Sequence, residues 1–242
     1  MRAVTCYICL LLCLNLPTLA VHSAEFAVTP LQDKVFLHQS GRYVEGYGMV
    51  TGNGLIVLTS DQHAVLIDTP WDAADVDELF TWLEERGLTL QGVIVTHSHE
   101  DAGGHLAMFH ERDIPSWAYA LTNKLLAEQG ETPATHSFSG SEWVVANRLE
   151  AFYPGPGHTM DNSVVWLAEH NILFGGCFIR EQATDSLGYT AEGDVSVWPD
   201  SLKQVQARYP KAQWVVPGHG EVGGQQLIEH TAALASAARS PR

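Results

Sequence analysis

Two apolar runs in this chain each end at a small-residue turn that carries histidine, and this repetition constrains the fold most strongly. The segment "QGVIVTHSH" spans residues 91–99, and "AQWVVPGHG" spans residues 212–220. A short apolar run bounded by turn residues is typical of a buried strand. Strands and helices alternate on either side of both runs, so the same order of elements occurs in each half of the chain.

The repeated order predicts an α/β protein of the αββα sandwich class, with two mixed sheets packed together and helices outside. We expect one domain over residues 21–242, with two pseudo-symmetric halves at about 25–150 and 151–240. The alternative is a plain three-layer α/β sheet, which the hairpin-rich segment 35–70 disfavours. In the sandwich, the histidine-bearing turns meet at one edge, where strands end and loops begin.

Local signals place the individual elements. Strands are expected over 35–40 and within 47–70, with turns at Gly52–Gly54 and Ser60–Asp61. A helix is expected over 72–87, with Asp72 as its N-cap and Gly87 as its C-terminal stop. Further helices are predicted over 103–112, 121–129, 196–210 and 225–239, and further strands over 117–120, 148–154 and 163–176, the last a hairpin turning at 169–171.

The first residues resemble a secretory signal peptide. Arg2 precedes an apolar run over residues 4–16, and small residues follow at Ala20, Ser23 and Ala24. We expect residues 1–20 to be the signal, with cleavage after Ala20 or as late as Ala24, and the mature chain to be periplasmic. The apolar run is shorter than the ~20 residues of a membrane span. An uncleaved anchor or a buried N-terminal helix is the alternative.

Charge and cysteine content narrow the function. The net charge of −15 argues against a nucleic-acid partner or a basic membrane-binding patch. Three of the four cysteines lie in the predicted signal, so Cys177 alone remains and an intramolecular disulfide is excluded. At this level Cys177 is a buried apolar residue, a dimer link, a reactive thiol or a metal ligand.

Residue types that bind metals collect in loops after the predicted strands. They are His97, His99, Asp101, His158, Cys177 and His219. Alternate residues of an extended segment point the same way, so His97 and His99 can reach one ion and Asp101 a neighbouring point. His105 also follows a strand, but we expect it and the remaining histidines to be structural.

Imidazole, thiolate and carboxylate are the ligands that zinc prefers. His97, His99 and His158 would form a first zinc site whose fourth position is open to water, and Asp101, Cys177 and His219 would form a second. Zinc in an open three-histidine site lowers the pKa of water to about 7, and two ions roughly 3.5–4 Å apart divide the work of hydrolysis.

At these residues the chain resembles the subclass B1 metallo-β-lactamases, and among them the imipenemase-type enzymes. The matching segments run from about Val35 to His230. They include "IDTPW" (67–71), "THSHED" (96–101), "FYPGPGHT" (152–159), "ILFGGCFIR" (172–180), "SLGY" (186–189) and "VVPGHGEVG" (215–223). The His-x-His-x-Asp motif indicates only the broad superfamily, whereas the later motifs at these spacings are specific.

The resemblance implies a periplasmic enzyme with two zinc ions that opens the β-lactam ring of penicillins, cephalosporins and carbapenems. Ala102 stands where the wider superfamily carries a second-site histidine, and Cys177 takes the second-zinc role instead. Hydroxide held at the first site by the three histidines would attack the lactam carbonyl, and Asp101 would orient it. The second zinc would stabilise the leaving nitrogen, and no acyl-enzyme would form.

The resemblance also assigns residues that bind substrate. Arg180 lies where many members carry Lys, and its fork of donors suits a substrate carboxylate. Tyr189 replaces an Asn proposed to assist the oxyanion, and its reach differs. Tyr47 lies in a hairpin that resembles the flap over the substrate, where it forms an aromatic wall or packs on the core. Asp68 is expected to support a ligand histidine.

Two other functions remain open at this level. One is a hydrolase of lactones or thioesters on the same fold, and the other is a non-catalytic periplasmic zinc-binding protein. Ala102 and Cys177 count against the first, and the open three-histidine site and Arg180 against the second. The expected partner is a small β-lactam bound by a monomer, with no nucleic acid and no membrane span.

Overall fold

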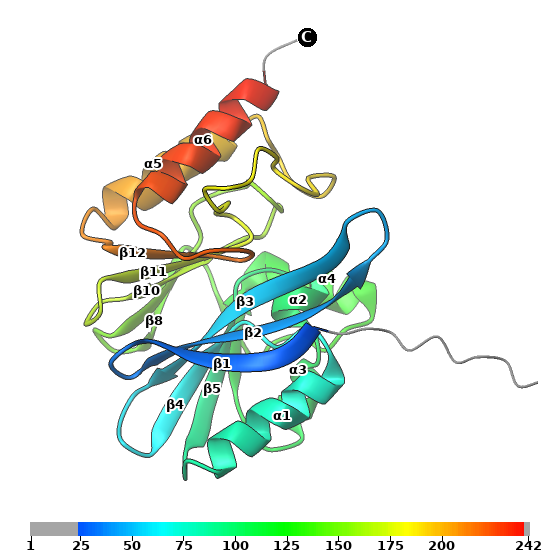
Figure 1. Ribbon diagram of the computed structural model, residues 1–242, viewed down its shortest axis with the longest axis vertical. Helices are drawn as coiled ribbons and strands as arrows, with labels where there is room; N and C mark the ends of the chain where they lie inside the picture. The colour runs from blue at the N-terminus through cyan, green and yellow to red at the C-terminus, as the bar shows by residue number, and fades with distance from the viewer. Residues whose placement is uncertain (1–23, 240–242) are drawn as a thin grey trace, which may run out of the picture.

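The structure is a computed structural model that describes residues 24–239, and it contains two sheets packed face to face (Figure 1). In spatial order, the first sheet consists of β1 (Ala24–Gln32), β2 (Val35–Val44), β3 (Gly48–Leu58), β4 (His63–Ile67), β5 (Thr89–Val95), β6 (Ser116–Tyr119) and β7 (His136–Phe138). The second consists of β12 (Trp214–Pro217), β11 (Ile172–Gly176), β10 (Val164–Leu167), β9 (Leu149–Phe152) and β8 (Ser141–Val145).

Both sheets are mixed, as predicted. In the first, neighbours from β1 to β4 pair antiparallel and neighbours from β4 to β7 pair parallel. In the second, β11 and β12 pair parallel and the other neighbours antiparallel. The chain passes from one sheet to the other between Phe138 and Ser141. The predicted signal peptide lies outside the described residues.

Helices cover the outer face of each sheet, which confirms the αββα sandwich (Figure 1). Apolar residues of α1 (Ala73–Glu84), α3 (Leu106–His110) and α4 (Ala120–Gln129) pack on the first sheet. Those of α5 (Trp198–Arg208) and α6 (Gln226–Ala238), which lie side by side, pack on the second. A single turn of helix, α2 (Glu100–Gly103), follows β5 and carries Asp101. Among residues 24–239, no helix is both long and apolar enough to cross a bilayer.

The apolar runs are continuous because the central strands are buried on both faces. In β5, Val93 and Val95 pack against the helices while Ile94 packs against the other sheet. In β11, Leu173 faces the helices and Phe174 faces the first sheet. Successive strand residues point to opposite faces, so both must be apolar when both are covered. The strands therefore hold their C-terminal ends, and the residues that follow them, in a rigid frame.

The turn expected at Gly52–Gly54 is wrong, because these residues lie inside β3. Gly54 permits a close approach instead. A Cβ at Gly54 would lie 2.1 Å from Nε2 of His38, whose ring crosses the strand. Asn53 links the two sheets: its backbone N–H donates to Gly218 O at 2.8 Å and its Nδ2 donates to Pro217 O at 2.9 Å. The chain instead turns at residues 45–47, between β2 and β3.

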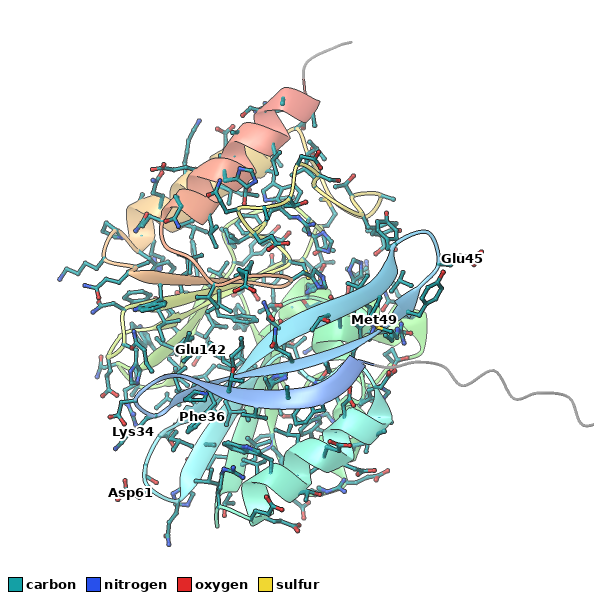
Figure 2. All side chains as sticks on the ribbon, viewed as in Figure 1. Lys34, Phe36, Glu45, Met49, Asp61 and Glu142 are labelled. Atoms are coloured by element: carbon teal, nitrogen blue, oxygen red, sulfur yellow. The ribbon has the colours of Figure 1, made fainter. Side chains whose placement is uncertain are left out.

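The hairpin formed by β2 and β3 projects beyond the body of the sandwich (Figure 1). Glu45 and Met49 lie at its end, with Met49 45% exposed (Figure 2). The side chain of Tyr47, in the turn, is 62% exposed. This exposure rules out the alternative in which Tyr47 packs on the core.

The other local predictions hold to within a few residues. Helix α1 follows Asp72, whose side chain makes no capping hydrogen bond and instead lies 3.9 Å from Arg42 Nη1. The helix ends at Glu84, and Gly87 follows with a φ of +62°. Leu88 N–H then donates to Leu83 O, which closes the helix end, as a left-handed glycine allows. The turns at Ser60–Asp61 and after β10 are where the sequence places them.

Candidate metal centre

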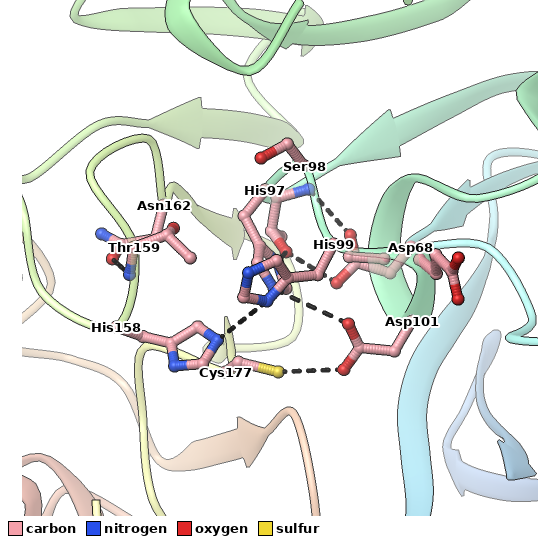
Figure 3. A network of polar contacts seen from close by, with 12 residues as sticks. Asp68, His97, Ser98, His99, Asp101, His158, Thr159, Asn162 and Cys177 are labelled. Atoms are coloured by element: carbon pink, nitrogen blue, oxygen red, sulfur yellow. Dashed lines mark hydrogen bonds and ion pairs between the residues drawn. The ribbon is translucent and has the colours of Figure 1, made fainter. Parts of the chain in front are cut away.

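Three histidine rings meet at the edge of the sandwich where β5 ends (Figure 3). His97 and His99 follow β5, and His158 comes from the loop between β9 and β10. The ring centroids lie 4.7–5.2 Å apart and the rings stand nearly at right angles to one another. Nε2 of His158 faces Nδ1 of His99 at 3.3 Å. One nitrogen from each ring lies within 4.8 Å of the others, close enough to hold one metal ion.

Neighbouring groups fix the orientation of two of these rings, those of His99 and His97. Nε2 of His99 lies 2.7 Å from Oε2 of Glu192, which leaves Nδ1 facing the cluster. Nδ1 of His97 lies 3.2 Å from Oγ1 of Thr96, which leaves Nε2 facing it. A hydrogen bond to the outer nitrogen sets the position and basicity of a ligand imidazole.

Asp101, Cys177 and His219 form a second cluster beside the first. Sγ of Cys177 lies 3.3 Å from Oδ2 of Asp101 and 3.3 Å from Nε2 of His219, and these two atoms are 3.2 Å apart. Nδ1 of His219 donates to Thr51 O of β3 at 2.9 Å, so Nε2 faces the cluster. His97 stands between the two clusters, with its Nε2 3.7 Å from Oδ1 of Asp101. The ligand atoms of His97, Asp101 and Cys177 also lie within 4.8 Å of one another.

The protonation states suit metal ligands. Burial lowers the pKa of His97 to about 4, helped by His99, and lowers the pKa of His158 well below its usual value. Both imidazoles are therefore neutral at pH 7, the form that binds metals. Burial alone would raise the pKa of Asp101, but the hydrogen bond from His219 and the nearby imidazoles lower it overall. Burial and the Asp101 carboxylate raise the pKa of Cys177, so a thiolate there requires an added positive charge.

The donor set fits zinc. Nε2 of His97 is buried and has no hydrogen-bond partner among the described residues, although it faces both clusters. A buried polar atom without a partner costs free energy, which a bound cation would recover. Nitrogen, thiol and carboxylate groups are the ligand types found in zinc sites. Here these groups lie about 3–5 Å from one another.

A cleft of about 610 Å³ lies over both clusters. Its lining includes the predicted substrate residues Arg180, Tyr189 and Tyr47, together with Trp71 and Arg42. The ring of Tyr189 lies 5.8 Å from that of His99, and the negative charge of Glu192 raises the pKa of Tyr189. The structure thus brings every predicted substrate residue to the rim or wall of one cleft above the histidines.

Asp68 supports the first cluster indirectly, through Thr96. Its carboxylate accepts hydrogen bonds from the backbone N–H and the hydroxyl of Thr96, both at 2.7 Å, and touches no ligand histidine. Asp68 holds a φ of +56°, which an Asp adopts more readily than most residues. His105 stays outside the clusters, and its Nε2 lies 3.1 Å from the Trp71 carbonyl oxygen.

Sequence reasoning missed several residues that shape the site. Glu192 reaches His99 from 93 positions away, in a loop without periodicity. Oδ2 of Asp161, which is fully buried, accepts the Ser98 N–H at 2.9 Å and so holds the turn between His97 and His99. Arg42 stacks over the Trp71 ring at 5.0 Å and pairs with Glu100. Only Asp161 carried a local signal, since it lies three residues after His158.

The sandwich and the two clusters at its edge define an α/β protein with a candidate metal centre. Residues 51–219, more than half of the chain, match the sequence profile described as "Metallo-beta-lactamase superfamily". The chain belongs to this superfamily.

Relatives extend the match over most of the chain. A protein of Pseudomonas aeruginosa named metallo-beta-lactamase type 2 is 43% identical over 208 residues, 86% of this chain and 83% of its own length. The crystal structure of VMB-1 at pH 5.5 is 41% identical, with a TM-score of 0.87 over 89% of this chain and 99% of that one. The crystal structure of the metallo-beta-lactamase FIM-1 from Pseudomonas aeruginosa in its mono-zinc form is 36% identical, with a TM-score of 0.85 over 90% of this chain and 98% of that one.

Proposed function

We propose that this protein is a zinc-dependent hydrolase that opens the amide bond of β-lactams. The proposal rests on one observation. The cluster that contains His97 and the cluster that contains Asp101 lie side by side beneath one cleft, and Arg180 lines the same cleft. The relative from Pseudomonas aeruginosa, which matches along most of the chain, bears the name of this activity.

His97, His99 and His158 are proposed to hold the metal that activates water. Zinc in such a site supplies a Lewis acid that lowers the pKa of water and polarises a carbonyl. Asp101 has a lowered pKa and therefore stays ionised, so its carboxylate can accept a hydrogen bond from the attacking water and orient it. Asp68 acts through Thr96 to orient the imidazole of His97, and Glu192 orients that of His99.

The walls of the cleft are proposed to orient the substrate. Arg180 binds the carboxylate next to the lactam ring, because a guanidinium offers two parallel donors. Tyr189, beside His99, donates a hydrogen bond to the oxygen that becomes negative during attack. Tyr47, on the exposed turn of the β2–β3 hairpin, covers the apolar face of the substrate.

Finer features belong to the same proposal. Asp101, Cys177 and His219 hold a second zinc, supported by their mutual contacts of 3.2–3.3 Å. Carbapenems are among the substrates. Residues 1–20 direct export to the periplasm, and residues 21–242 act there as a single-domain monomer.

Hydrolysis of a chromogenic cephalosporin tests the activity directly. Purified protein would be assayed in zinc-replete buffer, after dialysis against a chelator, and after zinc is restored. We expect activity, its loss and its recovery. No hydrolysis in zinc-replete buffer would contradict the proposal, and activity that survives full chelation would contradict its metal chemistry.

The same preparation separates the alternatives. A lactone or thioester hydrolase would cleave those esters and leave the cephalosporin intact. A zinc-storage protein would bind zinc and cleave none of them. Penicillin, cephalosporin and carbapenem assayed in parallel define the substrate range, and light scattering gives the oligomeric state.

A further inference from the structure

No residue of helix α6 lines the cleft, but the helix anchors the segment that carries Arg180. We call residues 177–192 the Arg180 loop. It begins at Cys177, directly after β11, and passes along the cleft to Glu192. Two consecutive residues of α6, His230 and Thr231, bond its backbone.

The hydroxyl of Thr231 both donates and accepts a hydrogen bond. It donates to Leu227 O one helical turn earlier, at 2.7 Å, and accepts the Arg180 N–H at 2.9 Å. Thr231 is fully buried, so water cannot replace it as the acceptor. A hydroxyl has one proton and two lone pairs, which is what this double role requires.

The second anchor is His230, whose Nε2 lies 2.8 Å from Thr184 O. Between the anchors, the Arg180 side chain folds over its own loop, and its Nε donates to Ser186 O at 3.2 Å. Its guanidinium packs on Gly188, where a Cβ would lie 3.4 Å from both terminal nitrogens. The position of the guanidinium thus depends on the backbone that α6 holds.

We infer that Thr231, assisted by His230, is a positioning residue that sets where Arg180 presents its guanidinium to the substrate carboxylate. The inference rests on the proposed function of Arg180. It follows from the geometry because a bidentate contact requires both donors in place, and a displacement of about 1 Å in a positioned group is enough to weaken catalysis.

Kinetics with matched substrates tests the inference. The variants are T231V, which keeps the shape of the side chain but removes the hydroxyl, and T231S, which keeps the hydroxyl. S236A is the matched control, because it removes an α6 hydroxyl that bonds Ala232 O in the same way. Each would be assayed on a penicillin and on the same penicillin with its carboxylate converted to the methyl ester.

We expect T231V to raise KM for the free acid by about 5- to 10-fold, less than complete loss of a charged contact would, because the guanidinium is displaced and not removed. Its kcat, and all constants for the ester, should change by less than about twofold, as should those of T231S and S236A. In an R180A background, T231V should add almost nothing, because the two residues act through one contact. Equal losses on acid and ester, or full additivity with R180A, would overturn the inference.

Amide hydrogen exchange provides a readout that does not depend on catalysis. Without its buried acceptor, the Arg180 N–H should exchange about 5- to 100-fold faster in T231V and stay protected in T231S. If the wild-type chain cleaves no β-lactam, the proposed function fails while this measurement still decides whether Thr231 anchors the loop. Unchanged exchange in T231V would refute the anchor itself.

Discussion

Removal of the Glu192 carboxylate should weaken zinc binding at the three-histidine cluster, although Glu192 is not among its predicted ligands. Its Oε2 lies 2.7 Å from Nε2 of His99 and fixes that ring with Nδ1 toward the other two. In E192A the ring is free to rotate about its side-chain bonds. Zinc binding must then also order the ring, which makes the free energy of zinc binding less favourable.

The contact sets the size of the effect. A charged hydrogen bond contributes about 1.5–3 kcal/mol. The Glu192 side chain is 51% exposed, so solvent screening places this contact near the lower limit. About 1.5 kcal/mol corresponds to a roughly tenfold loss of zinc affinity, the lower end of the range for partners of metal ligands.

The assay is a zinc titration against a competing chelator of known affinity, at fixed pH and ionic strength. E192Q keeps an oxygen acceptor and should lose less than about threefold, because a neutral hydrogen bond is weaker than a charged one. E131A is the matched control, since it removes a carboxylate from the same cleft and leaves the contact between His99 and Glu192 in place. Equal zinc affinity in E192A and E131A would refute the reasoning.

Four further results are expected. R180A should lower kcat/KM for β-lactams with a free carboxylate by about 10- to 150-fold, and unchanged kinetics across several of them would remove Arg180 from substrate binding. C177S should retain one zinc per chain by metal analysis where the wild type retains two, and two zincs in the variant would mean that Cys177 is not a ligand. Burial and two neighbouring carboxylates raise the pKa of Asp75 to about 6, above its unfolded value of 3.8. Ionised Asp75 therefore costs stability above pH 6, and D75N should raise the free energy of unfolding by about 1–2 kcal/mol at pH 8. That gain should vanish near pH 4, and a gain independent of pH in denaturant titrations would contradict it. N53A should lose about 1–3 kcal/mol of stability by the same method, because it leaves two carbonyls between the sheets without their donor, and a loss below about 0.5 kcal/mol would show that water replaces it.

The sequence predicted the sandwich because its strongest signals come from residues buried on both faces. The run before His97 is apolar at every strand position near its end, since β5 contacts helices on one side and a sheet on the other. Helix α1 was equally clear, because it begins after Asp72 and ends before Gly87, the two residues that predicted its limits. Predictions failed where a residue type has two uses, as at Gly52–Gly54, where Gly54 admits the His38 ring and no turn forms.

The metal cluster was readable because each expected ligand lies in the segment that follows a strand, and strand ends of packed sheets meet at one edge. The residues that orient these ligands were not readable in the same way. Glu192 lies in an irregular loop, and Thr231 reaches Arg180 from a helix whose pattern reports only its packing. Their roles depend on distances across the fold that no local pattern encodes.

Strand β3 contributes both to the hairpin above the cleft and to the position of His219. Its outer part forms the projecting hairpin above the cleft, while Thr51 on the same strand supplies the carbonyl that orients His219. Asn53, two residues further, fastens the strand to the loop that carries this histidine. A change that bends the hairpin to admit a bulkier substrate should therefore displace the carbonyl that orients His219, a proposed metal ligand. We therefore expect substitutions in β3 to change substrate range and zinc affinity together.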